Sequence, residues 1–304
     1  MTPLWQREPV GVVGLGLIGG SLGLDLIAAG ARVHALVHRP ATAERARERG
    51  LASAVSTDPA VLQGCGLVVL ALPLDRLLDP DPALLAALPA AAVITDVGSV
   101  KGPVLRRWRE LLLAAAAAGG GGPDPSRFVA SHPMAGTARA GVEAGEIGLF
   151  RDRPWVATPV ATPEASTDPA ALQAVRELAE ALGARWLCCD AEAHDRAVAL
   201  ISHLPVLVGA ALLQAADAGG GETCEGADLV RALASSGFAD TTRVGGGNPE
   251  LGMLMARANR AALLEALGHY HRSLSSLEAM VAGEEWAPLQ QSLARSALLR
   301  PDFL

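Results

Sequence analysis

This sequence contains few cysteines and few aromatic residues, and its acidic residues outnumber its basic ones. Its 304 residues include 4 cysteines and 3% aromatic residues, and the formal net charge is −7. The cysteines show neither a Cys-x-x-Cys pair nor a Cys/His spacing typical of zinc, so we expect no metal site. A negative net charge gives no general attraction to nucleic acid or to an anionic membrane, and we expect neither as a partner.

Signals for export and for membrane insertion are also weak. The N-terminal stretch MTPLWQREP lacks the basic region and apolar core of a signal peptide, and we expect a cytoplasmic protein. One apolar run, residues 197–216, approaches membrane length, but the Ser-His-Leu-Pro segment at 202–205 would be costly in lipid. A helix that is apolar on all sides also suits the centre of a large fold or a dimer, which we favour.

Up to about residue 190, short apolar runs of strand length alternate with helical segments. Strands are expected at 10–13, 32–37, 66–72, 92–96, 128–131, 155–158 and 185–189. Helices are expected at 21–29, 42–49, 82–88 and 169–182, with a low-complexity loop at 114–126. This alternation predicts an α/β domain over residues 1–190, a doubly wound parallel sheet of the Rossmann type.

Beyond residue 190 the strand signals stop, and apolar residues recur at the helical period to the end of the chain. Helices are expected at 192–216, 226–236, 249–267 and 269–282. The sequence therefore predicts an all-α domain over residues 191–304. Its helices are too apolar for a solvated surface, so we expect this domain to form a homodimer.

A glycine cluster follows the first expected strand, in the stretch GVVGLGLIGG. Gly14 suits a tight turn, Gly16 allows pyrophosphate to approach the backbone, and Gly19 allows the helix to pack on the strand. With Leu17 and Ile18 at the start of the helix, these residues predict a dinucleotide-binding loop. A glycine-rich turn without a ligand is the alternative interpretation.

The end of the second expected strand indicates which dinucleotide binds. A site that prefers NAD places an acid there, about 20 residues after the glycines, to accept from the ribose 2′-hydroxyl. This sequence has His38 and Arg39 instead. The forked cation of Arg39 suits a 2′-phosphate, which predicts NADP as the cofactor. Alternatively, Arg39 is solvated and the site discriminates little between NAD and NADP. Leu72 and Pro73, at the end of a later strand, are also assigned to the cofactor.

A second group of motifs contains the residues suited to catalysis: DVGSVK at 96–101, SHPMAGT at 131–137, HD at 194–195 with SHLP at 202–205, and GFADTTR at 237–243. Ser99 and His132 follow expected strands, and ligands in a doubly wound sheet lie beyond the carboxyl ends of the strands. Both are therefore expected to face the nicotinamide. A lone histidine is more often structural than catalytic, but this placement favours catalysis.

These motifs, together with LF, W and TP within residues 149–159 and the NPE segment at 248–250, resemble the prephenate/arogenate dehydrogenase family of tyrosine biosynthesis. The resemblance runs in order from about residue 10 to residue 265. It implies a Rossmann domain, a helical dimerisation domain and the oxidative decarboxylation of a cyclohexadienyl ring to a phenol, without a metal. In this family's chemistry His132 would take the ring hydroxyl proton, and Ser99 would bind the same hydroxyl or orient His132.

The resemblance also implies substrate contacts from both domains. Arg243 would hold a substrate carboxylate as a bidentate clamp, with Gly136 and Thr137 nearby. His203 would add a polar contact from the apolar helix, although a histidine satisfied within the core is the alternative. Lys101 is left unassigned between a cofactor contact and a surface charge.

Three departures from the family's pattern lie near the region that reads the substrate side chain: Ala138, Ala239 and Gly252. With the expected NADP preference, they make the chain most similar to an NADP-dependent arogenate dehydrogenase, forming tyrosine. Prephenate as the substrate is the first alternative. A 3-hydroxyacid or 6-phosphogluconate-like NADP dehydrogenase is another, and a regulator that senses nucleotide is a third. No segment suited to a regulatory or chorismate mutase domain is evident, so we expect a monofunctional enzyme.

Overall fold

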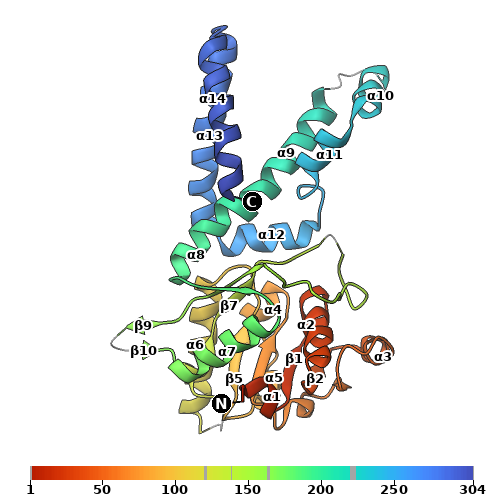
Figure 1. Ribbon diagram of the computed structural model, residues 1–304, viewed down its shortest axis with the longest axis vertical. Coiled ribbons are helices and arrows are strands. Elements are labelled where there is room, and N and C mark those ends of the chain that lie inside the picture. The colour runs from red at the N-terminus through yellow and green to blue at the C-terminus, as the bar shows by residue number, and fades with distance from the viewer. Residues whose placement is uncertain (1, 120–121, 138, 163–164, 220–223, 304) are drawn as a thin grey trace.

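The computed structural model describes residues 2–119, 122–137, 139–162, 165–219 and 224–303. The N-terminal part of the chain forms an α/β region, and the C-terminal part forms an all-helical region that extends from it (Figure 1). The last strand ends at Cys188, Asp190 caps the next helix, and only helices follow in the described part of the chain. The expected fold class, a Rossmann-type sheet followed by an all-α domain, is therefore confirmed.

The main sheet is wholly parallel and follows the order β3-β2-β1-β4-β5-β6. This is the strand order of a dinucleotide-binding Rossmann sheet. Its strands are β1 (Val10–Val13), β2 (Val33–Leu36), β3 (Ala54–Ser56), β4 (Leu67–Leu70), β5 (Val93–Asp96) and β6 (Phe128–Val129). The connecting helices are α2 (Leu17–Ala28), α3 (Pro40–Glu48), α4 (Leu74–Leu78), α5 (Pro82–Ala87) and α6 (Gly102–Ala117), and α1 (Leu4–Arg7) precedes the sheet.

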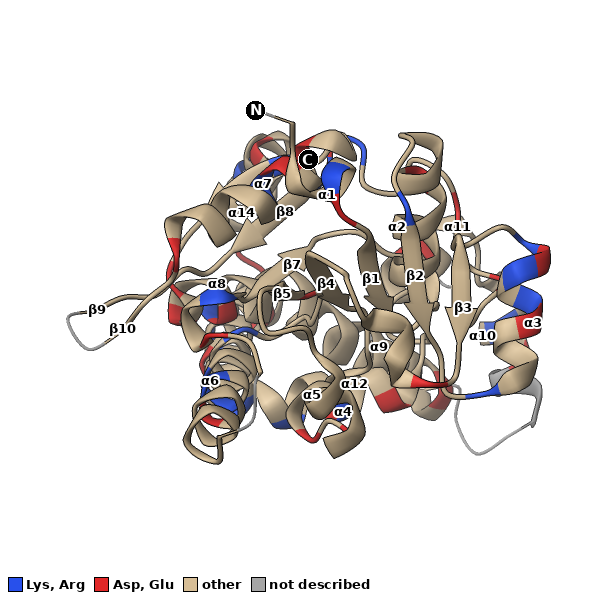
Figure 2. Ribbon diagram, turned by 90° about the horizontal axis from the view of Figure 1, so that it is seen from below, with Lys and Arg blue, Asp and Glu red and all other residues tan. Residues whose placement is uncertain are grey.

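Both faces of this sheet are buried, because alternate strand residues contribute to different hydrophobic cores. In β4, Leu67 and Val69 pack in one core with α2, while Val68 and Leu70 pack in the other with α6. Continuous apolar strands of this kind are expected when helices cover both faces of a sheet. Charged residues gather on outer helices such as α3 and α6, and β1 and β2 carry none (Figure 2).

A smaller sheet joins the main sheet to the helical region. It contains β7 (Ser131–Pro133), β8 (Pro154–Ala157) and β11 (Arg185–Cys188), in the order β11-β8-β7. The hairpin β9 (Ala161–Thr162) and β10 (Ala165–Ser166) and helix α7 (Pro169–Ala181) lie between β8 and β11 along the chain.

The expected strand over 128–131 is wrong at its carboxyl end. β6 stops at Val129, and the chain then enters β7, which pairs antiparallel with β8. The hydroxyl of Ser131 bonds to Asp96 O at 2.9 Å and the amide of Ser131 to Asp96 Oδ1 at 3.1 Å, so the chain turns out of the main sheet. His132 therefore follows the end of β6, as expected, but it lies within a strand of the smaller sheet.

The helical region consists of α8 (Ala191–Val198), a π-helical turn (Ala199–His203), α9 (Leu204–Gly219), α10 (Cys224–Leu233), α11 (Ser236–Thr242), α12 (Pro249–Ala258), α13 (Arg260–Ala282) and α14 (Trp286–Leu299). The sequence predicts that one helix ends at residue 267 and the next begins at residue 269. This boundary is wrong, because the chain leaves helical geometry at Asn259. The side-chain amide of Asn259 donates to Asp195 O at 2.7 Å, and this contact fixes the break.

The stretch Ala191–Gly219 is long and apolar enough to cross a membrane by length and composition alone. In the fold it packs on other elements, with contacts from α8 to α6 and from the π-helical turn to α13. Its polar residues His194, Asp195 and His203 are buried against those neighbours. Of these three, His203 lies in the π-helical turn, and His194 and Asp195 lie within α8.

Candidate active site

The glycine turn between β1 and α2 has the geometry that a dinucleotide needs. Gly14 adopts φ +94°, and a Cβ there would overlap the carbonyl oxygen of Ala71. A Cβ on Gly19 would overlap Gly14 O, so α2 packs directly on the strand end. By contrast, a Cβ on Gly16, the N-cap of α2, would meet nothing within 4 Å. Open space in front of a helix N-terminus fits a pyrophosphate group.

The other expected cofactor residues surround this turn. Leu17 and Ile18 form the half-buried first turn of α2. Leu72 is half-buried and Pro73 is exposed just beyond β4, and the Cβ position of Gly14 lies 3.5 Å from Leu72 Cδ2. The structure therefore brings the glycine turn and the end of β4 together at one edge of the sheet.

His38 and Arg39 are exposed immediately beyond the carboxyl end of β2. Arg39 occupies the N-cap position of α3 without a side-chain capping bond. No residue from 37 to 43 is acidic. The edge where an adenine ribose lies in a Rossmann domain thus presents a cation and no carboxylate from this segment.

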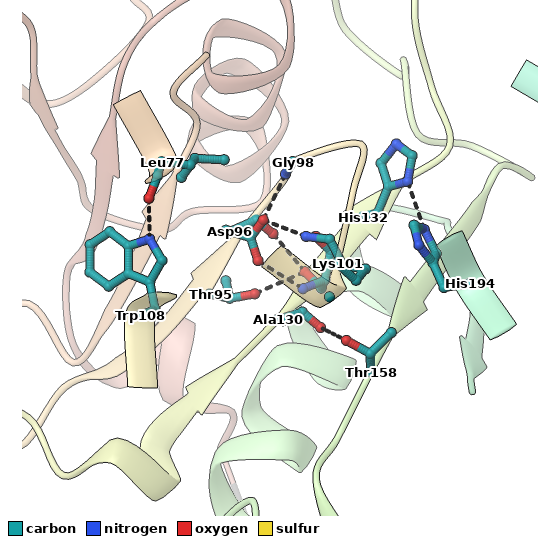
Figure 3. A network of polar contacts seen from close by, with 12 residues as sticks. Leu77, Thr95, Asp96, Gly98, Lys101, Trp108, Ala130, His132, Thr158 and His194 are labelled. Carbon is teal, nitrogen blue, oxygen red and sulfur yellow. Dashed lines mark hydrogen bonds and ion pairs between the residues drawn. The ribbon is translucent and has the colours of Figure 1, made fainter. Parts of the chain in front are cut away.

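A buried polar network joins the end of β5 to β7 (Figure 3). Lys101 has no exposed surface, and its ammonium pairs with Asp96 and donates to Ser131 O at 2.6 Å. Burial lowers the pKa of Lys101, an effect that the Asp96 carboxylate opposes. The hydroxyl of Ser131 also accepts from Trp155 Nε1 at 3.0 Å. Since Ser131 directly precedes His132, this network fixes the position of the histidine.

His132 is half-buried on β7, opposite Val156 of β8. Its Nδ1 lies 3.0 Å from Nε2 of His194 on α8, and the two rings meet edge to face with centroids 5.2 Å apart. Burial, followed by the positive charge of Lys101, holds the pKa of His132 well below its ordinary value of 6.5. A neutral imidazole at pH 7 can accept a proton, as a general base must.

His194 links His132 to a buried carboxylate. Its Nδ1 lies 2.8 Å from Asp195 Oδ1. Asp195 also accepts the backbone N–H groups of Lys101 and Gly102, at 2.7 and 2.8 Å, where α6 begins. Burial works against the ionisation of Asp195, but these hydrogen bonds together hold its pKa below the usual value. Neither His194 nor Asp195 was assigned a role from the sequence.

His203 lies on the π-helical turn and is 2% exposed. Its Nδ1 lies 3.3 Å from the side-chain nitrogen of Asn259, while its buried Nε2 has no hydrogen-bond partner among the described residues. Burial lowers the pKa of His203 to about 4. The contact of Nδ1 supports a histidine satisfied within the core. The absence of a partner for Nε2 among the described residues leaves that nitrogen available for a contact with the substrate.

Ser99 is half-buried in the loop between β5 and α6. In the described part of the chain it makes no side-chain hydrogen bond, and the partner of His132 Nδ1 is His194. The expectation that Ser99 orients His132 is therefore not realised here. The alternative, a hydrogen bond from Ser99 to the substrate hydroxyl, stays a prediction.

A cavity of about 430 Å³ begins beyond β7, and its lining includes the expected substrate residues Gly136, Thr137 and Arg243 but not His203. Its polar lining comes from both domains: Gly136, Thr137, Glu146, Arg151, Arg153 and Arg243. Glu146, Arg151 and Arg153 were not expected from the sequence. Of the departures from the family's pattern, Ala239 is exposed on α11 and Gly252 lies on α12, whereas Ala138 lies outside the described residues.

The described residues contain no group of His, Cys, Asp or Glu side chains that could hold a metal ion. The glycine turn, the strand order and the helical second domain define a two-domain, dinucleotide-dependent oxidoreductase. A family model of the prephenate dehydrogenase nucleotide-binding domain matches residues 22–188, and one of the prephenate dehydrogenase dimerization domain matches residues 190–295. The chain therefore belongs to the prephenate dehydrogenase family, whose enzymes act in tyrosine biosynthesis.

Relatives and solved structures agree with this membership. The chain is 30% identical over 280 residues to a cyclohexadienyl dehydrogenase of Zymomonas mobilis, covering 91% of this chain and 89% of that protein. The crystal structure of Synechocystis arogenate dehydrogenase is 37% identical, with a TM-score of 0.77, covering 97% of this chain and all of the other. Prephenate dehydrogenase from A. aeolicus, in complex with hydroxyphenyl propionate and NAD+, is 26% identical, with a TM-score of 0.85 and 98% of each chain covered.

Proposed function

We propose that the protein is a cytoplasmic, homodimeric arogenate dehydrogenase that uses NADP. Gly14, Gly16, Gly19 and the start of α2 would hold the pyrophosphate, and Arg39 the 2′-phosphate. When bound, the oxidised nicotinamide would supply the acceptor for the hydride from C4 of the substrate ring. Support for the family's general reaction comes from His132, a neutral histidine fixed at the edge of the cofactor domain.

His132 would act as the general base through Nε2, since Nδ1 is engaged by His194. It takes the proton of the C4 hydroxyl as the hydride leaves C4. The bond from C1 to the carboxylate then breaks, its electron pair enters the ring and CO2 departs. The ring is now a phenolate, and His132 returns the proton to its oxygen. No net proton is released, and the aromatic ring makes the reaction favourable.

The mixture of charges in the cavity supports arogenate as the substrate. Arogenate and prephenate both carry a ring carboxylate and a side-chain carboxylate, which the guanidinium groups of Arg151, Arg153 and Arg243 suit. Only arogenate also carries an ammonium group. Glu146 supplies a negative charge in the same cavity, which would attract that ammonium group and repel a keto acid.

The test is a comparison of kcat/KM for both substrates with both cofactors. We expect arogenate with NADP to give the highest value. Glu146→Gln should lower kcat/KM for arogenate roughly 10-fold, as for the loss of one charge-assisted contact, and leave that for prephenate unchanged or raised. Glu143→Gln is the matched control, because Glu143 lies in the same loop but pairs with Arg45. Higher kcat/KM with prephenate in the wild type would contradict the proposal.

The dimer is supported by apolar side chains exposed on the helical region. Leu264, Leu274, Trp286 and Leu293 on α13 and α14 are each about half exposed or more, at 52%, 48%, 58% and 56%. Such side chains at helical spacing favour burial against a second copy. Static light scattering should give twice the chain mass of 31.1 kDa. A monomer at micromolar concentration would contradict this part of the proposal.

A further inference from the structure

A chain of hydrogen bonds runs from His132 to the beginning of α6. His132 Nδ1 contacts His194 Nε2 at 3.0 Å, and His194 Nδ1 contacts Asp195 Oδ1 at 2.8 Å. Asp195 accepts hydrogen bonds from the backbone N–H groups of Lys101 and Gly102. The chain therefore crosses from the cofactor domain to α8 and back. His194 is 3% exposed, so water does not compete for these bonds.

The direction of each hydrogen bond follows from the carboxylate. An ionised carboxylate only accepts, so His194 must carry its proton on Nδ1 and donate it to Asp195. The Nε2 of a neutral His194 then has a lone pair and accepts from His132 Nδ1–H. A neutral His132 with its proton on Nδ1 has a bare Nε2. That nitrogen is the one free to act as a base.

We propose that His194 and Asp195 are positioning residues that hold His132 in the tautomer with a bare Nε2 facing the substrate hydroxyl. This inference rests on the proposed function, in which His132 is the general base. The carboxylate selects the tautomer of His194, and His194 selects that of His132. Neither residue touches the substrate. The same contacts stabilise the imidazolium that forms when His132 takes the proton.

Two substitutions of His194 separate positioning from packing. His194→Leu removes the acceptor for His132 Nδ1–H, whereas His194→Gln places an amide oxygen close to where Nε2 lay. We expect the leucine variant to lose roughly 10–100-fold in kcat with little change in KM, as for other groups that orient a functional histidine. The glutamine variant should recover most of that loss. His269→Leu, an exposed histidine on α13, is the control and should match the wild type.

Asp195→Asn gives a spectroscopic test. An asparagine amide can donate to His194 Nδ1, which moves the His194 proton to Nε2 and forces the His132 proton to Nε2 as well. The ring ¹⁵N shifts of His132, assigned by the loss of its signals in His132→Asn, should show Nδ1–H in the wild type and Nε2–H in Asp195→Asn. We expect kcat of Asp195→Asn to fall roughly 10³–10⁴-fold, as when a carboxylate that sets a histidine tautomer is lost.

The outcomes distinguish this inference from the function on which it rests. If His132→Asn keeps wild-type kcat, the proposed function fails. If His132 is essential but the leucine and glutamine variants of His194 have equal kcat, the positioning role is wrong. A wild-type His132 that carries its proton on Nε2 would also overturn it, whatever the stability of Asp195→Asn. Cofactor affinity, measured by fluorescence titration, should be unchanged in every variant.

Discussion

The ammonium of Lys101 and the carboxylate of Asp96 form an ion pair with no solvent exposure on either side chain. Asp96 is the last residue of β5 and Lys101 directly precedes α6, so the pair closes the loop that carries Ser99. Both members of the pair also contact Ser131, the residue before His132, and Asp96 accepts in addition from the amide of Gly98. The loop that carries Ser99 and strand β7, which carries His132, are thus held by one buried charge pair.

Breaking this pair should destabilise the fold. Lys101→Met leaves the Asp96 carboxylate buried and uncompensated, and we expect the free energy of unfolding to fall by about 3–5 kcal/mol. Denaturant unfolding of the apoprotein measures the change. The double variant Asp96→Asn/Lys101→Met removes both charges and should recover a large part of the loss. A loss below about 1 kcal/mol in Lys101→Met would show that the pair contributes little.

His132→Ala should reduce kcat steeply and leave cofactor binding intact. Removal of a general base costs roughly 10²–10⁴-fold in kcat. Steady-state kinetics measures this effect, with circular dichroism and NADP titration to confirm the fold. His269→Ala serves as the control for the loss of a histidine. Near-normal kcat in His132→Ala would make the histidine structural and return attention to Ser99 and His203.

The sequence predicted the parts of this site that belong to local motifs. The glycine turn follows a short apolar run and Arg39 follows a segment of alternating residues, and the structure has both at the expected strand ends. The contact between His132 and His194 spans 62 positions and depends on how α8 packs against β7. No periodicity within either segment encodes that packing. The HD pair and the DVGSVK segment can both be recognised in the sequence, but only the folded structure shows that Asp195 accepts from the amide of Lys101.

The split of the expected strand at 128–131 has a similar cause. A short apolar run predicts a strand through this segment, whereas the turn at Ala130 depends on the carboxylate of Asp96, which accepts from the amide of Ser131. The arginines of the cavity were missed because Arg151 and Arg153 look like ordinary surface charges in a loop. Only the fold places them in one cavity with Arg243 of the helical region.

Arg39→Asp should reverse the cofactor preference. It removes the cation for the 2′-phosphate and supplies an acceptor for the ribose 2′-hydroxyl. We expect the Kd of NADP to rise roughly 10–100-fold, as for the loss of a charge-assisted hydrogen bond, and that of NAD to stay the same or fall. Isothermal titration with each nucleotide measures both. Arg32→Asp makes the same charge change near the other end of β2 and should have no effect. Equal losses for both nucleotides would count against a 2′-phosphate site.

Arg243→Ala should raise KM more than it lowers kcat. In the proposed function the guanidinium would contact a carboxylate that is present in both the bound substrate and the transition state, so its loss should weaken both states alike. Steady-state kinetics with arogenate measures the two constants separately. Arg257→Ala, an exposed arginine on α12, is the control. A fall in kcat without a rise in KM would assign Arg243 to the transition state alone.

Stability should depend on pH through His203. Its folded pKa of about 4 is lower than the ordinary 6.5, so between these values the unfolded chain binds a proton that the folded protein does not. The stability contributed by neutral His203 is therefore complete above pH 6.5 and is lost as the pH falls towards 4. A difference of this size corresponds to about 3 kcal/mol.

His203→Asn isolates this contribution. The asparagine oxygen can still accept from Asn259, as His203 Nδ1 does, but it does not titrate in this range. The wild type should lose about 3 kcal/mol more in unfolding free energy between pH 7 and pH 4 than the variant, since other groups titrate alike in both. Urea unfolding at a series of pH values measures the difference. His269→Asn, at an exposed histidine on α13, is the matched control for the loss of a histidine. Parallel curves for His203→Asn and the wild type would mean that His203 has the same pKa in the folded and unfolded chain.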